Sequence, residues 1–178
     1  MRGAFMGLFD LFDKKVDSGS EWAQLIYGET KPGKMLSQKM VEADTKQAIS
    51  FRLRAIQDCV KLVNETTTPG VFFSRYDTMI EHMEWMARIE KYYPFKHPFP
   101  SENLERVKRQ KVATINDFID RSHQKLMLSL LKLKTEKGRR NKVTDWYNLM
   151  TFYSDKMDDE NIMRYSEIYS RYQPETYQ

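Results

Sequence analysis

The stretch from Ser101 to Lys137 contains neither proline nor glycine, and its apolar residues recur at every third or fourth position. This spacing places the apolar side chains on one face of a helix. Ser101 is a candidate N-cap, and Gly138 suits the left-handed residue that often closes a helix. We predict one helix over residues 101–137, roughly 55 Å long at about 1.5 Å per residue. The face comprises Val112, Ile115, Ile119, Ser122, Leu126, Leu130 and Leu133, widened by Phe118, Met127 and Leu131.

The remaining prolines and glycines divide the chain into further amphipathic segments. From residue 34 onward they fall between these segments or at their ends, as helix breakers do. We predict a helical hairpin of about residues 35–65 and 69–93, followed after the long helix by two C-terminal helices, about 139–157 and 158–172. Asp158 or Asp159 would cap the last of these. Strand-like alternation is absent from the sequence, so the predicted fold class is all-α, an antiparallel helical bundle built along the helix 101–137.

The N-terminal region, residues 1–33, is predicted to be a flexible amphipathic segment with a short helix at 21–27. The expected single helical domain then covers residues 34–173. Residues 6–15 form a short amphipathic segment in which four large apolar residues stand beside Asp10 and Asp13. It fits a docking peptide, a weak membrane-surface anchor, or a helical turn that folds back on the bundle or simply frays. Lys14 and Lys15 are the basic residues there, so membrane contact is the less favoured of these readings.

Composition narrows the class of protein. The chain has 40% hydrophobic and 30% charged residues, typical of a globular protein. Its net charge of +4 permits an acidic partner without requiring one. No run approaches the about 20 apolar residues that span a bilayer. Cys59 is the one cysteine, which excludes an internal disulfide and makes a reducing cytoplasm the expected location.

Basic residues concentrate in two places. Residues 132–142 hold six of them against Glu136 alone, close to Trp146 and Tyr147. Such clusters can hold phosphates, so nucleic-acid or polyanion binding is a candidate function. The alternative is that these cations favour a helix C-terminus and that Trp146, on an apolar stripe, belongs to the core. The candidate residues are Lys132, Lys134, Lys137, Arg139, Arg140 and Lys142, with Arg106, Lys108, Arg109 and Lys111 as a second cluster.

Three tyrosines follow the apolar stripe of the last helix: Tyr165, Tyr169 and Tyr172. Half-buried tyrosines with solvated hydroxyls are common at protein interfaces. Packing of this helix onto its own bundle would use the same stripe. Both alternatives are open from the sequence.

Evidence for a metal site or for catalysis is weak. Asp120 and His123 form an Asp-x-x-His pair, with Asp117, Glu81, His82 and Glu84 as further candidates. Di-metal bundles use two Glu-x-x-His motifs and two more glutamates; here one motif has that form, and its acid is Asp. No glycine-rich phosphate loop or nucleophile motif is present. We therefore predict no metal and no cofactor, and a non-enzymatic protein is favoured while an enzyme stays open as an alternative.

Three short pieces, Met6–Phe12, Phe73–Asp77 and Lys134–Arg139, resemble segments of small bacterial and prophage-type helical proteins without an established activity. The resemblance implies a bacterial or phage origin and brings no activity with it. From the residues themselves, we expect a non-enzymatic helical module that binds a protein partner or a second copy of itself. The alternative function is nucleic-acid or polyanion binding by residues 132–142.

Overall fold

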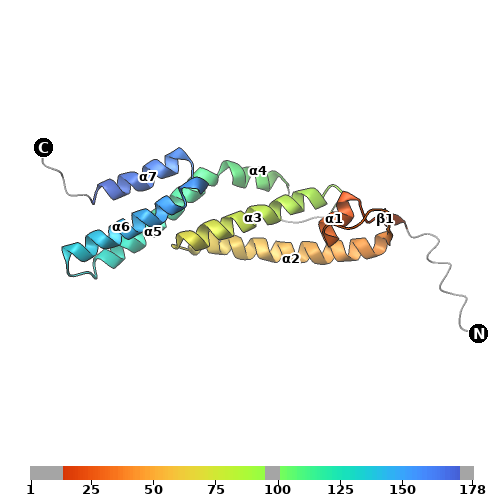
Figure 1. Cartoon of the computed structure of the whole chain (residues 1–178), viewed down its shortest axis with the longest axis horizontal. Helices are drawn as coiled ribbons and strands as arrows, with labels where there is room; N and C mark the ends of the chain where they lie inside the picture. Colours follow the sequence, from red (N-terminus) through yellow and green to blue (C-terminus); the bar gives the residue numbers. More distant parts are fainter. Residues whose placement is uncertain (1–13, 95–100, 173–178) are drawn as a thin grey trace, which may run out of the picture. The chain divides into compact units, whose positions relative to one another are not determined.

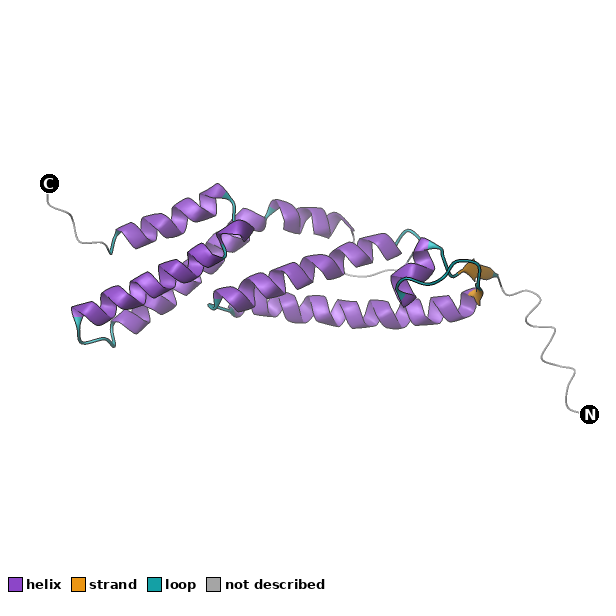
Figure 2. Cartoon of the chain, viewed as in Figure 1, coloured by secondary structure: helices purple, strands orange, loops and turns teal. Residues whose placement is uncertain are grey.

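The computed structural model describes residues 14–94 and 101–172, and leaves the side chains of residues 101 and 102 undescribed. Within these residues the chain forms seven α-helices, one short 3-10 helix and two short strands (Figure 1, Figure 2). The predicted all-α fold class is confirmed. The segments that the sequence analysis singled out at residues 6–12 lie outside the described residues.

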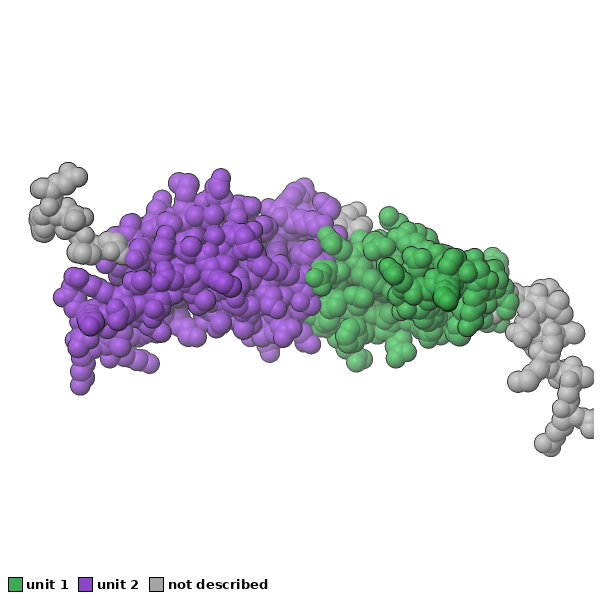
Figure 3. Space-filling model, viewed as in Figure 1, with its two compact units in different colours: residues 1–56, 81–101 green, residues 57–80, 102–178 purple. Residues whose placement is uncertain are grey.

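The chain divides into two compact units (Figure 3). Unit 1 comprises residues 1–56 and 81–101, and unit 2 comprises residues 57–80 and 102–178. Helices α2 (Gln38–Glu65) and α3 (Pro69–Ile89) supply residues to both units. These two helices are the predicted hairpin, with Pro69 at the first helical position as its missing N–H favours. The predicted domain boundary at residue 33 stays a prediction.

Unit 1 contains a two-stranded antiparallel sheet that the sequence analysis did not predict. Strands β1 (Lys15–Asp17) and β2 (Met35–Ser37) pair with Val16 opposite Leu36. Each strand is three residues long, too short for an alternating pattern to be recognised. The predicted start of the hairpin at residue 35 is therefore wrong, and the helix begins at Gln38.

Two tryptophans fix helix α1 (Glu21–Tyr27) against α2 and α3 in unit 1. The Trp22 indole N–H donates to Thr45 Oγ1 at 3.0 Å, and the Trp85 indole N–H donates to the Leu25 carbonyl at 3.0 Å. Ser20 caps α1 by accepting from the backbone N–H of Ala23. The predicted helix at 21–27 is confirmed.

The predicted long helix over 101–137 is wrong at its middle. The chain forms α4 (Ser101–Arg109) and α5 (Lys111–Leu130), separated at Gln110. A straight helix would bring positions 108 and 111 onto the face shared by Leu104 and Ile115, and both positions hold lysine. A continuous helix would therefore place two lysines on its apolar face. The break at Gln110 avoids this, because α4 and α5 can then bury different faces.

The predicted end of that helix is also wrong. Helix α5 ends at Leu130, and α6 (Glu136–Phe152) begins after Thr135, whose side chain accepts a hydrogen bond from the Gly138 N–H. Gly138 therefore lies in the first turn of α6, and it does not have the positive φ of a helix-closing glycine. Thr135 is an N-cap residue of a type that favours the start of a helix. By starting α6 at this point, it prevents α5 from continuing to Lys137.

Helices α5, α6 and α7 (Asp159–Ser170) form an up-down-up three-helix arrangement in unit 2 (Figure 1). The Trp146 indole N–H donates to Ser122 Oγ at 2.9 Å between α5 and α6. The rings of Tyr147 and Tyr169 stack at 4.0 Å between α6 and α7. Asp158 forms a capping box at the start of α7, so the predicted cap is confirmed.

The part of α3 in unit 2 packs on α5 through aromatic rings. Phe118 stacks on Phe72 with ring centroids 4.2 Å apart and meets Phe73 edge-on at 6.0 Å. Phe118 and Phe72 are fully buried. Cys59 belongs to the same unit and is a buried free thiol, and burial raises its pKa. Cys59 is therefore a core residue of unit 2.

Candidate docking cleft

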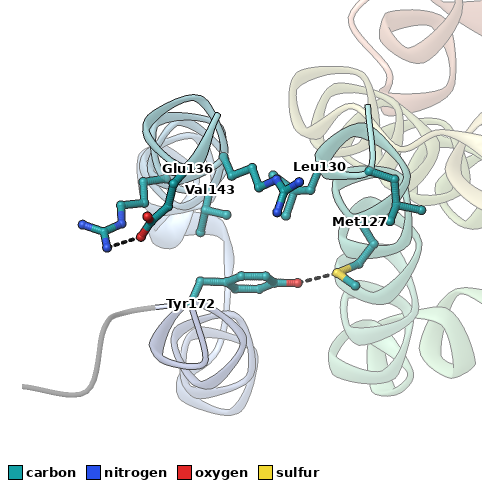
Figure 4. A pocket seen from close by; sticks show the side chains of 8 residues that line it. Met127, Leu130, Glu136, Val143 and Tyr172 are labelled. Atoms are coloured by element: carbon teal, nitrogen blue, oxygen red, sulfur yellow. Dashed lines mark hydrogen bonds and ion pairs between the residues drawn. The ribbon is translucent and has the colours of Figure 1, made fainter. Parts of the chain in front are cut away.

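An open cleft lies where the end of α5, the first half of α6 and the chain just after α7 approach one another (Figure 4). Its volume is about 490 Å³, within the range of about 300–1,000 Å³ usual for ligand-binding cavities. All of its lining belongs to unit 2. The lining residues are Met127, Leu130, Leu131, Glu136, Arg139, Arg140, Val143 and Tyr172.

The apolar lining has a buried floor and exposed walls. Val143 and Leu130 form the floor and are buried. Met127 is 44% exposed and Leu131 is 77% exposed. Leu131 directly follows the last residue of α5, and its backbone angles are still helical. It therefore continues the apolar stripe of α5, at a point where α6 does not cover the side chain. The cleft therefore presents apolar surface that the bundle itself does not bury.

Tyr172 closes one side of the cleft. In Figure 4 its ring extends from the chain beyond α7 toward α5, where the hydroxyl meets the Met127 sulfur. The same hydroxyl lies 2.8 Å from His123 Nε2. Burial raises the pKa of Tyr172 and lowers the pKa of His123. Burial thus favours the uncharged forms of both groups.

Cations border the cleft on the α6 side. Arg140 forms an ion pair with Glu136 one turn earlier on α6, and Arg139 Nε donates to the Leu133 carbonyl at 3.0 Å. The structure brings the predicted basic segment 132–142 together around the α5–α6 turn. The six basic side chains are exposed there: Lys132, Lys134, Lys137, Arg139, Arg140 and Lys142.

The second predicted basic cluster does not join the first. Arg106, Lys108 and Arg109 lie on α4 and Lys111 starts α5, while the cleft lies at the other end of α5. Helix α5 has 20 residues, so the two clusters are separated by about 30 Å of helix. Lys111 also pairs with Asp158 at 3.7 Å.

The three candidate tyrosines have different environments. Tyr165 is buried, with its ring 5.6 Å from that of Tyr147. Tyr169 is half-buried and stacks on the same Tyr147 ring. Only the third, Tyr172, lines the cleft. The interface role of the tyrosines stays a prediction, and the geometry favours Tyr172 for it.

The candidate metal ligands are engaged in other interactions. Asp120 forms an ion pair with Arg164, with Nη2 and Oδ1 2.8 Å apart. His123 contacts Tyr172, and His82 Nδ1 lies 2.9 Å from Arg52 Nη1. Among the described residues, no three His, Cys, Asp or Glu side chains are grouped as metal ligands would be. Trp146 is buried and bonded to Ser122, so it does not offer a face for base stacking.

Sequence reasoning identified Arg139, Arg140 and Tyr172 but did not propose Met127 or Leu131 as binding residues. The available signal was the width of the α5 stripe, which Met127 and Leu131 extend beyond a narrow seam.

Comparison with known proteins adds no relative: no family model matches the chain, and neither do any curated protein or solved structure. None of the helices in the described residues combines the length and apolar character needed to cross a bilayer.

Proposed function

We propose that this chain is a non-enzymatic helical module for protein–protein interaction, and that its cleft binds an amphipathic, acidic helix of a partner protein. The observation that carries the proposal is the exposure of Leu131 and Met127 in the lining of the cleft that also contains the buried Val143 and Leu130. Contiguous exposed apolar surface with a polar rim is typical of interaction sites.

The shape and chemistry of the cleft favour a helix as its occupant. Grooves of this kind accept the apolar face of an amphipathic helix, whose anchors recur at positions i, i+3, i+4 and i+7. The Met127 side chain is unbranched and polarizable, so it can adapt to different apolar anchors. The Tyr172 ring gives a rigid apolar wall with a polar end, as is common at interfaces.

The charge around the cleft favours an acidic partner. Residues 132–142 carry six exposed cations and Glu136, so the potential at the α6 rim is positive. Complementary charge raises the association rate more than it raises affinity, and the effect is reduced by salt. Arg140 is already paired with Glu136, whereas the guanidinium of Arg139 contacts a neutral carbonyl.

A matched pair of variants tests the proposal. Leu131→Asp places a carboxylate on the wall of the cleft, whereas Leu128→Asp changes a leucine that is 62% exposed on α5 and does not line the cleft. The probe is a fluorescent helical peptide with leucine at i, i+3, i+4 and i+7 and glutamate elsewhere. We expect Leu131→Asp to weaken binding at least tenfold and Leu128→Asp to leave it unchanged. Equal effects of both variants, or equal affinity for a lysine version of the peptide, would contradict the proposal.

The alternative function is nucleic-acid or polyanion binding, favoured by the exposure of all six cations around one helix–helix turn. Arg139→Glu and Arg140→Glu distinguish the two functions. If the chain binds polyanions, retention on immobilised DNA falls steeply with salt and is lost in these variants, while Leu131→Asp, which adds one negative charge and reverses no cation, has the smaller effect. If it binds a protein helix, Leu131→Asp has the larger effect.

The location and origin stay predictions of the sequence. A buried free thiol at Cys59 is compatible with the expected reducing cytoplasm. The bacterial or phage origin rests on the resemblance of short segments alone.

A further inference from the structure

The partner of the cleft can be specified further, on the assumption that the proposed function holds. We propose that the cleft binds residues 4–13 of a second copy of this chain. These residues lie outside the part of the chain that the structure describes, so their sequence is what can be compared with the cleft.

The apolar residues of this segment have the spacing of a helix that docks into a groove. Phe5, Leu8, Phe9 and Phe12 stand at positions i, i+3, i+4 and i+7, the pattern of helix-in-groove anchors. In a helix these four side chains would share one face. Three of the four are phenylalanine, and large aromatic anchors contribute most to such contacts. The apolar floor and exposed walls of the cleft provide the matching surface.

The charges of the segment are complementary to those of the cleft. Residues 4–13 contain Asp10 and Asp13 and no basic residue. In a helix both aspartates would fall on the same side of the apolar face, because they are three positions apart. That acidic edge matches the rim on which Arg139 and Arg140 stand. A membrane-surface anchor would need the opposite charge, since anionic lipids attract basic residues.

The size of the segment also fits the cleft. A helix over residues 5–13 would be about 14 Å long, or two and a half turns. The cleft of about 490 Å³ has room for apolar anchors from such a helix, with its backbone lying across the opening rather than inside it.

Exchange between two copies gives the contact twice. Each copy carries one apolar segment and one cleft, so a pair that exchanges segments forms two identical contacts related by a two-fold axis. The second contact forms within an already associated pair, which makes the combined association stronger than either contact alone. Homodimerisation thus occupies both clefts of the pair.

The test uses the full chain and four substitutions. Phe9→Asp disrupts the apolar face of the segment and Leu131→Asp disrupts the cleft. Leu11→Asp, off that face, and Leu128→Asp, off the cleft, are the matched controls. Sedimentation velocity over a wide range of concentration should show a dimer for the wild type and both controls, and a monomer for Phe9→Asp and Leu131→Asp. An equimolar mixture of these two monomeric variants should recover a heterodimer, because one intact segment and one intact cleft remain.

A synthetic peptide of residues 4–13 separates this inference from the proposed function. It should bind the full-length Phe9→Asp variant, and at least tenfold more weakly when Leu131→Asp is added. If the generic glutamate peptide binds the cleft while the 4–13 peptide does not, the inference is overturned and the proposed function stands. A wild type that stays monomeric, or a dimer that persists in both Phe9→Asp and Leu131→Asp, overturns it as well. If neither peptide binds, both proposals fail.

Discussion

Asn161 is a buried polar side chain whose removal should destabilise unit 2. It is fully buried at the third position of α7. Its amide nitrogen donates to the Val112 carbonyl at 3.0 Å and to Asn116 Oδ1 at 2.9 Å, and its oxygen accepts from the Asp158 N–H at 3.2 Å. One side chain thus joins the start of α7 to the start of α5 and completes the cap of α7.

The expected cost of Asn161→Ala follows from these contacts. Each buried hydrogen bond contributes about 0.5–1.5 kcal/mol net, and groups left without a partner cost more than the mean. Three lost bonds and a small cavity give about 2–4 kcal/mol. Urea denaturation followed by circular dichroism measures this, with Asn148→Ala as control because Asn148 is exposed on α6. The control should change stability by no more than about 0.5 kcal/mol.

Asn161→Asp provides a second, sign-specific check. The new carboxylate would face the Val112 carbonyl and Asn116 Oδ1, two acceptors, in a fully buried position. Its one donor is the Asp158 N–H, and burial opposite two acceptors raises the pKa of that carboxyl above its unfolded value. Stability should therefore come nearest to that of the wild type below pH of about 4 and be lost as pH rises through the raised folded pKa. A loss under about 1 kcal/mol for Asn161→Ala, or no pH dependence for Asn161→Asp, would refute the assignment.

Two further predictions concern unit 2. Burial lowers the pKa of His123, so the unfolded chain binds the proton first, and the stability that neutral His123 contributes is lost as pH falls below about 6.5. Thermal unfolding of His123→Gln should therefore be less sensitive to acid than that of the wild type. Equal sensitivity of the two proteins would count against this role of His123. Phe118→Ala should cost about 3–5 kcal/mol in chemical denaturation, because Phe118 is fully buried against Phe72 and Phe73; a cost below about 1.5 kcal/mol would exclude this ring cluster as core.

The sequence predicts helix boundaries where a breaker or a cap acts locally. Pro69 starts α3 and Asp158 caps α7 as expected, because their effects depend on residues within one turn. The break at Gln110 involves neither proline nor glycine. It follows from how α4 and α5 bury different surfaces, which is a tertiary effect that spacing along one segment does not reveal. The local feature of the sequence that indicates this break is the pair of lysines at positions 108 and 111.

The candidate site could be predicted only in part, for a related reason. The basic residues 132–142 are contiguous in sequence, so their clustering is a local property. Met127 and Leu131 are candidate binding residues because no neighbouring helix buries them. Their exposure depends on where α7 ends relative to α5. Periodicity assigns all apolar residues of a stripe to the core alike, whereas here Leu130 is buried and Leu131, the next residue, is 77% exposed.

The early end of α5 is what creates the cleft. Had the helix continued to Lys137, as the uninterrupted stripe indicated, no chain reversal would place Arg139 and Arg140 opposite Met127. The reversal occurs because Thr135 caps α6 and α5 stops at Leu130, and the apolar side chains beyond that point are left beside the turn. The same N-cap that the sequence analysis passed over therefore positions both the apolar walls and the basic rim on which the proposed recognition of an acidic helix depends.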